Sequence, residues 1–417
     1  MMDAGFLNRY FTAVAVKHLS AVEADGAASD QHEYNGVALL KKMFGTDAPR
    51  KTIPTVFLYL SDEKDETVEA SGALTWYDAR YRSPNRTEWR LYYPTNDVTM
   101  NAGPGDTLFI CRKPDGTLME IITQKDSTIE NQLFWLFDIR PDKNSHRFVE
   151  KTNLTNPPSA KVDFVARTIL QKIGIDLPQT EEDDTDRLIE QFGRTFPTTR
   201  EFSAFARTLV KDVDPVADPD GALVAWCSRE ETLFMCMERI DVEDRLKQGF
   251  VQNGKVDVDG FIHFSLAVNN RRKSRAGFSF EHHLEAVFLA NGIRYTHTPM
   301  TENRSKPDFI FPGITQYRDL SYPAAQLTML GAKTTAKDRW RQVLEEADRI
   351  DHKHLATMQG AISEHQTDEM ISRNLQLVVP TPIQPSYTEH QQKWLYSMSD
   401  FLDVVRARQR FLESRNV

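Results

Sequence analysis

Three residues, Asp308, Lys333 and Glu346, have the types and the spacing that metal-assisted hydrolysis of a phosphodiester requires. Asp308 opens the apolar run 309–311, and Lys333 follows a second apolar run at 327–330. A divalent cation neutralises phosphate oxygens and acidifies a water, and Mg²⁺ prefers oxygen ligands such as carboxylates. Two acids with a lysine near the attacking water therefore predict a Mg²⁺-dependent site that cleaves phosphodiesters.

The spacing by itself is a weak signal, because a Pro-Asp turn and a surface lysine occur together by chance in many chains. The next segment strengthens the prediction. Lys337, Asp338 and Arg339 stand where a helix is expected to begin. Lys and Arg donate to guanine, and Asp accepts from cytosine, in a major groove. A solvated first turn is the alternative, but the helix dipole disfavours cations there, so we expect an external anion.

A second basic cluster precedes the helix that is expected to carry Glu281. It packs four cations into a short run: Arg271, Arg272, Lys273 and Arg275. Such a run is usually a solvated loop, and in a nucleic-acid enzyme it often holds the phosphate backbone. The cluster offsets locally the acidic net charge of the chain.

The bulk properties describe a globular protein of ordinary composition. A length of 417 residues exceeds what one hydrophobic core usually serves, so two domains are expected. A net charge of −9 argues against indiscriminate polyanion binding but is compatible with local basic patches. Cys111, Cys227 and Cys236 are too few for a disulfide framework and lack metal-ligand spacing. Without a signal segment or a long apolar span, the sequence predicts a soluble cytoplasmic protein.

Residues 1–145 are predicted to form a β-rich domain behind an opening helix at 7–19. Short runs of β-branched and aromatic residues alternate with turns such as 103–106, and this pattern suggests a barrel or pseudobarrel. The turn at 103–106 lacks the Lys of a phosphate-binding loop, so it is expected to be a turn only. The runs are 56–60, 73–77, 89–93, 107–111 and 118–122. The polar, proline-bearing stretch 146–186 is the expected hinge, with a helical piece at 162–173.

Residues 187–417 combine helical periodicity with a few strand-like runs, which predicts an α/β domain. Strands are expected at 309–311, 327–330 and 375–379, and a closing helix at 394–411. The helix after Lys333 is expected to carry Glu346 and to have one apolar face, made of Trp340, Val343, Leu344, Ala347 and Ile350.

The catalytic domain of the EcoRII restriction endonuclease family resembles this chain closely at three stretches: 269–281 (NNRRKSRAGFSFE), 306–312 (KPDFIFP) and 333–348 (KTTAKDRWRQVLEEAD). The resemblance extends from about residue 188 to near the C-terminus and implies a restriction-endonuclease-like PD-(D/E)xK fold. It implies three metal-binding acids, Asp308, Glu346 and Glu281, and the catalytic lysine Lys333. It also implies that residues 337–339 read the ends of a CC(N)GG-like site.

One feature of the family is not matched in register. Family members hold a flipped central base with an Arg and, four residues later, an aromatic residue. The corresponding region, 226–231, does not contain that pair, although Trp226 and Arg229 could substitute for it.

Four residues of the first domain suit contacts with DNA bases. Arg86, Glu88 and Arg90 alternate from a turn into a predicted strand, and His32 precedes a helical segment. A salt-bridged surface is an equally good explanation for the alternating charges. This half is similar to the B3-like effector-binding domain found at the N-terminus of EcoRII and several other restriction enzymes. The similarity implies that these residues bind a second DNA copy and that the domain covers the catalytic cleft until then.

The prediction is a type II restriction endonuclease that dimerises through its catalytic domain and cuts both strands of DNA. The resemblance also implies a prokaryotic host and a cognate DNA methyltransferase that makes no direct contact. Two alternatives stay open: a DNA-binding regulator with a degenerate nuclease domain, and a single-strand nickase. The histidines at 282–283 and 351–354 lack a complete ligand set, so helix-surface histidines are expected there rather than metal sites.

Overall fold

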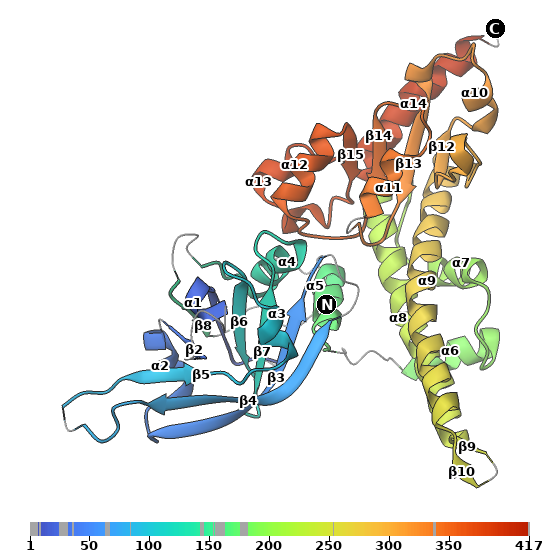
Figure 1. Cartoon of the computed structure of the whole chain (residues 1–417). Helices are drawn as coiled ribbons and strands as arrows, with labels where there is room; N and C mark the ends of the chain where they lie inside the picture. Colours follow the sequence, from blue (N-terminus) through green and yellow to red (C-terminus); the bar gives the residue numbers. More distant parts are fainter. Residues whose placement is uncertain are drawn as a thin grey trace. The chain divides into compact units, whose positions relative to one another are not determined.

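The chain divides into two compact units (Figure 1). The computed structural model describes all residues except 1–6, 8–9, 25–31, 36, 63–66, 84, 142–145, 153, 155–162, 176–181, 253, 337–338 and 416–417. The first unit comprises Met1–Ile175 and Gly360–Gln366, and the second comprises Asp176–Gln359 and Thr367–Val417.

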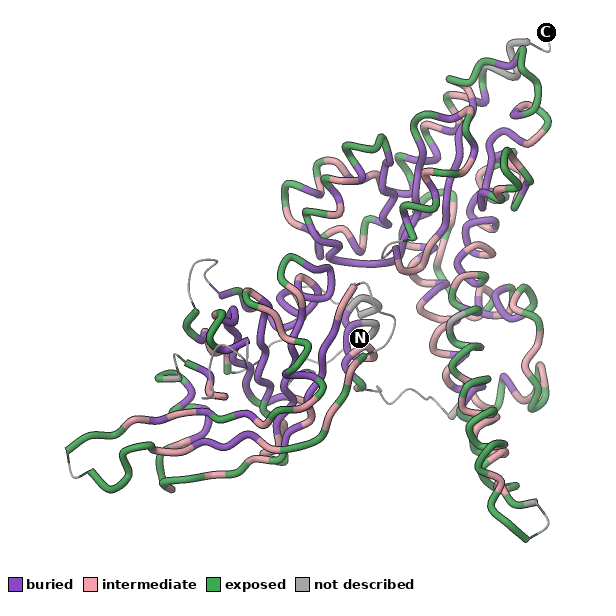
Figure 2. The backbone as a smooth tube through the Cα atoms, viewed as in Figure 1, coloured by how far each residue is buried: buried purple, intermediate pink, exposed green. Residues whose placement is uncertain are grey.

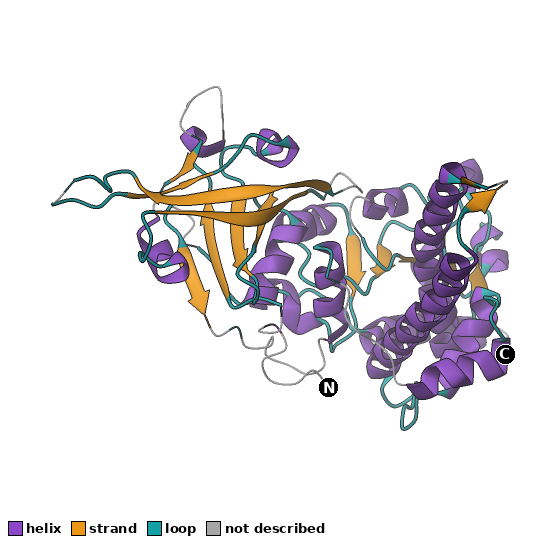
Figure 3. Cartoon of the chain, turned by 90° about the horizontal axis from the view of Figure 1, so that it is seen from below, coloured by secondary structure: helices purple, strands orange, loops and turns teal. Residues whose placement is uncertain are grey.

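The first unit is built on one large sheet, whose strands are drawn in orange in Figure 3. Its eight strands lie in the order β2-β5-β4-β3-β7-β6-β1-β8. Neighbouring strands are antiparallel except β3 and β7. The strands are β1 (Ala13–His18), β2 (Glu33–Tyr34), β3 (Arg50–Leu60), β4 (Val68–Asp78), β5 (Trp89–Tyr92), β6 (Thr107–Arg112), β7 (Leu118–Thr123) and β8 (Val149–Thr152). The five β runs expected from the sequence are confirmed as β3 to β7. Among the described strands, β2 and β8 form the two edges of this sheet.

The opening helix expected at 7–19 is wrong, because Ala13–His18 is the strand β1. All six residues of β1 are buried, and the strand lies between β6 and β8. A strand covered on both faces has a continuous apolar run rather than an alternating one. A short run of this kind cannot be told from a helix by its periodicity.

Short helices complete the first unit: α1 (Ala21–Ala24), α2 (Leu40–Phe44), α3 (Asp97–Asn101), α4 (Thr128–Phe137) and α5 (Asp163–Lys172). The expected hinge contains β8 and α5, and the two units divide between Ile175 and Asp176. The segment Gly360–Gln366 packs on α4, where Gln132 donates to the carbonyl of Gly360 at 2.9 Å. This unit therefore includes a piece of chain that is distant in sequence.

A mixed five-stranded sheet, in the order β11-β12-β13-β14-β15, is the centre of the second unit. Its strands are β11 (Thr296–His297), β12 (Phe309–Phe311), β13 (Thr328–Ala332), β14 (Lys353–Ala356) and β15 (Leu375–Val378). Strand β12 is antiparallel to both of its neighbours, β11 and β13, and β13, β14 and β15 are parallel. The predicted strands at 309–311, 327–330 and 375–379 are thus confirmed.

Helices surround this sheet and extend beyond it: α6 (Glu182–Phe192), α7 (Thr199–Thr208), α8 (Pro219–Gln248), α9 (Val258–Ala290), α10 (Ile314–Arg318), α11 (Trp340–Leu344), α12 (Glu364–Ser372), α13 (Glu389–Gln392) and α14 (Met398–Arg415). The long helices α8 and α9 run side by side and are joined by the hairpin of β9 (Val251–Gln252) and β10 (Lys255–Val256) (Figure 1). The end of α9 near this hairpin is largely exposed (Figure 2). In the described part of the chain, no helix is long and apolar enough to span a membrane.

Ion pairs join α8 and α9, and they correct the prediction that the basic run 271–275 is a loop. That run is helical, within α9, and not a loop. Arg271 and Arg272 pair with acids of α8, at 2.6 and 2.5 Å. Arg275 is only 7% exposed and its guanidinium lies 4.1 Å from the ring centroid of Phe202. The Arg275 side chain is therefore packed against aromatic rings of neighbouring helices, which disfavours the predicted contact with a DNA backbone.

Candidate active site

Asp308 and Lys333 meet at one edge of the five-stranded sheet. Asp308 immediately precedes β12, and Lys333 immediately follows β13. Because these two strands are antiparallel, with Phe309 opposite Leu330, the start of one lies beside the end of the other. The Lys333 ammonium donates to Oδ2 of Asp308 at 2.8 Å, and the amide of Ala332 donates to the same oxygen at 2.6 Å. The predicted convergence of the two residues is confirmed, and their catalytic roles stay predictions.

Glu346 approaches this pair from just beyond α11. The expected long helix is wrong, because α11 ends at Leu344 and Ala347 has a φ of 53°, which breaks helical geometry. The ammonium of Lys353 donates to the carbonyl of Leu344 at 2.5 Å and fixes the end of the helix. The apolar face was nevertheless predicted well, since Val343 and Ala347 are both buried.

Close packing holds α11 on β13. A Cβ atom added at Gly331 would lie 2.8 Å from Cγ2 of Val343, closer than ordinary van der Waals contact. A glycine at this position therefore lets the helix approach the strand that ends at Lys333. The helix in turn delivers Glu346 to the same sheet edge.

The electrostatics around Glu346 fit a divalent cation. Burial and the charge of Asp308 raise the pKa of Glu346 to about 7, against partial opposition from Lys333 and Lys353. Its Oε2 atom is buried and has no hydrogen-bond partner. A cation bound between the two carboxylates would neutralise their repulsion and give that oxygen a ligand role.

The third predicted metal acid, Glu281, binds a histidine. Its Oε2 lies 2.8 Å from Nε2 of His297, the last residue of β11. This hydrogen bond, opposed by burial and supported by Glu285, raises the pKa of His297. Within the residues that the structure describes, no three or more His, Cys, Asp or Glu side chains are gathered closely enough to hold a metal. The predicted set of Asp308, Glu346 and Glu281 is therefore not assembled as a three-acid group.

The predicted base-reading cluster is described only in part. Arg339 immediately precedes α11 and is exposed. Lys337 and Asp338 lie outside the described residues. Helix α11 thus has an exposed arginine at its beginning and Glu346 shortly after its end.

The proposed substitutes for the base-flipping pair are engaged elsewhere. Arg229 makes a bidentate pair with Asp184 at 2.5 and 2.7 Å, and Trp226 is 7% exposed. The guanidinium of Arg207 lies 5.9 Å from the Trp226 ring centroid. A role for Arg229 in holding a base would require it to leave a buried carboxylate.

In the first unit, Glu88 and Arg90 belong to a salt-bridged surface, which was the alternative interpretation of the sequence. Glu88 accepts from Arg80 and Arg90, each at 2.6 Å, and Arg90 also donates to Glu33 at 2.9 Å. These hydrogen bonds hold the pKa of Glu88 down, at about 2. Arg86 is exposed.

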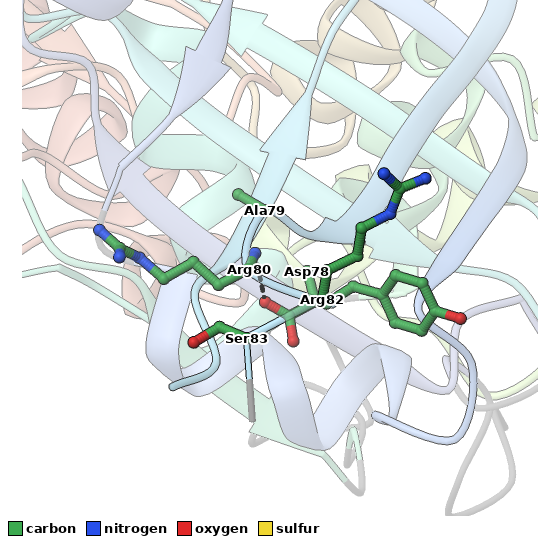
Figure 4. A pocket seen from close by; sticks show the side chains of 6 residues that line it. Asp78, Ala79, Arg80, Arg82 and Ser83 are labelled. Carbon is green, nitrogen blue, oxygen red and sulfur yellow. Dashed lines mark hydrogen bonds between the residues drawn. The ribbon is translucent and has the colours of Figure 1, made fainter. Parts of the chain in front are cut away.

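The turn before this network adds positive charge. Residues 78–83 line a shallow pocket in which the side chains of Arg80 and Arg82 point in different directions (Figure 4). Arg82 is exposed. His32 has a φ of 44° and its ring centroid is 5.5 Å from that of Tyr93. Sequence reasoning did not single out Arg80 within this cluster, because its partner Glu88 lies eight residues away, just before β5.

The histidine doublets need a correction. His283 and His354 are fully buried, so they are not helix-surface histidines. His354 belongs to the central strand β14, where burial lowers its pKa to about 3. Nε2 of His283 is 2.9 Å from Glu230, among the pairs that join α8 and α9. Cys111, Cys227 and Cys236 form no disulfide with one another, as predicted, and all three are buried.

Comparisons with known proteins assign the chain to a family. The family described as EcoRII C terminal matches residues 234–402. A solved structure of metal-depleted Ecl18kI in complex with uncleaved, modified DNA aligns over 56% of this chain and 86% of its own, at 19% identity and a TM-score of 0.45. The type II restriction enzyme SsoII of Shigella sonnei is 29% identical over 127 residues, 28% of this chain and 41% of SsoII. The type II restriction enzyme EcoRII of Escherichia coli is 30% identical over 397 residues, which is 93% of either chain. This chain therefore belongs to the EcoRII family of type II restriction enzymes.

Proposed function

We propose that this restriction endonuclease uses Mg²⁺ to cut both strands of duplex DNA at a CC(N)GG-like site. The observation that supports it best is the sheet edge where Asp308 binds Lys333 and where Glu346 keeps a buried oxygen unsatisfied. Such a combination is costly for stability alone, since two buried acids repel each other. It is understandable in a site that is completed by a cation and a phosphate.

Each side chain then has a separate task. Asp308 and Glu346 would hold the cation, which when bound supplies positive charge to the phosphate and lowers the pKa of a water. The Lys333 ammonium, 2.8 Å from Asp308, would orient the attacking water and stabilise negative charge on the scissile phosphate. Asp308 stays fixed because the amide of Ala332 also binds it.

Reading and cutting are linked through α11. Arg339 precedes this helix of five residues, and Glu346 follows it closely. A guanidinium bound to a guanine would therefore fix the helix that carries the metal acid. Lys337 and Asp338 complete the proposed reading element.

The cleavage product separates this proposal from its alternatives. A homodimer formed through the catalytic domain would cut both strands of a supercoiled plasmid and give linear DNA. Nicked circles without linear product would indicate a single-strand nickase instead. Equal plasmid integrity with Mg²⁺ and with EDTA would indicate a regulator with a degenerate nuclease domain. A cognate methyltransferase would protect the site without contacting this protein.

We expect the pH dependence of stability to report the pKa of Glu346. The folded-state pKa of about 7 lies above the ordinary value of 4.5, so the unprotonated form destabilises the metal-free fold. The contribution of protonated Glu346 to stability in EDTA is therefore fully present below about pH 4.5 and is lost as the pH rises through about 7. Melting temperatures from about pH 5 to 8 should fall more steeply for the wild type than for Glu346→Gln. If the melting temperatures of the two proteins change with pH in parallel, Glu346 is not the group that titrates. Adding Mg²⁺ should restore the stability that the wild type loses at high pH.

For the first unit we propose a B3-like effector-binding domain that restrains cleavage until it binds a second DNA copy. The exposed cations Arg82 and Arg86 support the proposal that this unit has a DNA-binding surface. We propose that Glu88, Arg90 and His32 belong to the same surface. An oligonucleotide duplex that contains the site should then accelerate cleavage of a single-site plasmid. A protein shortened by residues 1–175 should cleave that plasmid faster than the whole chain. If neither change accelerates cleavage, the restraint is absent.

A further inference from the structure

Exposed apolar side chains gather at the end of the α8–α9 pair, on the β9–β10 hairpin and the beginning of α9 (Figure 1). We call this group the tip surface, and its members are Val251, Val256, Val258, Phe261, Ile262 and Leu266. Each of these residues is between 48% and 75% exposed. Soluble proteins rarely leave such a group in water unless it is a binding surface. We therefore expect a partner to cover the tip surface.

Regular structure places these side chains together. Val251 and Val256 are register partners across the hairpin, so they lie on the same face of it. On α9, Val258, Ile262 and Leu266 recur every four residues and form one stripe along the helix. The stripe begins where the hairpin ends, so the two parts of the tip surface adjoin each other.

The tip is held by contacts on the other side of α9. The ring of Phe250, between α8 and β9, lies 5.3 Å from the Phe261 ring and 5.9 Å from the Phe264 ring, between centroids. The Arg245 guanidinium lies 3.8 Å from the Phe250 centroid. Asp257 caps α9, since its Oδ1 accepts from the amide of Gly260 at 2.9 Å. The stripe is therefore presented on an element that is already ordered.

We infer that the tip surface binds the tip surface of a second copy of this chain, with the two α9 helices antiparallel about Ile262. The inference rests on the proposed function, in which a dimer cuts both strands. In a twofold interface, a residue i that contacts a residue j of the other copy is matched by j contacting i. Val258 and Leu266 are equally distant from Ile262 in sequence. The stripe is thus complementary to itself, with Val258 of one copy on Leu266 of the other.

Charge favours a second copy over DNA as the partner. Residues 256–270 contain no lysine or arginine, and their acids are Asp257 and Asp259. A DNA backbone is bound through such cations. In the antiparallel pair the two Asp259 residues lie about 9 Å apart along the axis, given a rise of about 1.5 Å per residue. This separation exceeds the Debye length of about 8 Å at physiological salt, so their repulsion is largely screened.

The area of the tip surface also fits a dimer. A large apolar side chain presents roughly 100 Å² of apolar surface when fully exposed, so six that are about half exposed present roughly 300–400 Å². A standard interface buries about 800 Å² on each partner, and roughly 60% of this area is apolar. The tip surface therefore supplies most of the apolar area that one partner of a stable dimer needs.

Sedimentation velocity of the full-length protein, without DNA or metal and over a range of concentrations, measures the dimer. Ile262→Arg places like charges opposite each other at the twofold axis, so we expect the dimer dissociation constant to rise roughly 100-fold or more. Leu289→Arg is the matched control, because Leu289 is 69% exposed on the same helix but outside the tip surface. It should associate like the wild type. Association of Ile262→Arg as tight as that of the wild type, or a wild type that is monomeric throughout, would overturn the inference.

A charge exchange tests the antiparallel pairing even where Ile262→Arg folds poorly. Val258→Lys and Leu266→Glu should each weaken the dimer. Combined in one chain, they place opposite charges in contact across the axis, so association should recover to within roughly tenfold of the wild type. Additive losses in the double variant would overturn the inference.

Two further results separate this inference from its rivals. If Ile262→Arg lowers the melting temperature but leaves association unchanged, another part of the same chain covers the tip, and the inference is wrong. Linear plasmid from a wild type whose tip variants associate normally refutes the inference alone. Tip variants that dissociate as expected, with a wild type that cleaves no plasmid in Mg²⁺, support the dimer surface and refute the proposed function.

Discussion

Replacing Lys333 by alanine should reduce Mg²⁺-dependent plasmid cleavage by roughly 10²–10⁴-fold, in the range seen when a single catalytic proton donor or charge-stabilising group is removed. The ammonium is the positive side chain bound directly to Asp308, at 2.8 Å. Its loss would remove positive charge where a negative transition state forms. The measurement is the single-turnover rate of linearisation at saturating protein.

Lys306→Ala is the matched control for this prediction. Lys306 is exposed and lies two residues before Asp308. Its replacement by alanine therefore removes one positive charge close to the site and leaves the Lys333–Asp308 contact in place. We expect near-wild-type cleavage from this variant. Duplex binding in Ca²⁺ should be similar for both variants, because the expected defect is in chemistry. Wild-type cleavage by Lys333→Ala would refute the proposed role.

Replacing Glu230 by alanine should destabilise the second unit by about 3–5 kcal/mol, the usual cost of leaving one member of a buried ion pair without its partner. Glu230 is 2% exposed; its carboxylate lies 2.9 Å from His283 and 3.7 Å from Arg275. Burial would raise the pKa of Glu230, but its close contact with His283 lowers that pKa overall. The carboxylate is therefore charged and compensates the buried guanidinium.

Denaturant unfolding of the full-length protein measures this loss. Glu243→Ala is the control, because Glu243 pairs with Lys247 at the exposed surface of the same helix. We expect its unfolding curve to overlay that of the wild type. Adding Arg275→Leu to Glu230→Ala should recover part of the lost stability, since the unpaired buried cation is then removed. A shift for Glu230→Ala no larger than that of Glu243→Ala would show that the cluster contributes nothing to stability.

The sequence was most informative where local pattern and local structure coincide. The strand-like runs at 309–311 and 375–379 and the apolar face of 340–350 all followed from periodicity, and the structure contains them. The pattern failed for β1, whose two covered faces remove the alternation. It also failed for the basic run 271–275, where charge suggested a loop although the acids that pair with it lie on α8.

By itself, the sequence determined the residue types of the site: an acid before one strand, a lysine after the next, and a second acid beyond a short amphipathic segment. Only the tertiary structure decided that Glu346 lies past the end of α11, that Arg275 is buried, and that His297 binds Glu281. The physical reason is the same in each case. Residue type and spacing are local properties, whereas burial, pairing and the pKa of a carboxylate depend on elements that are brought together only when the chain folds.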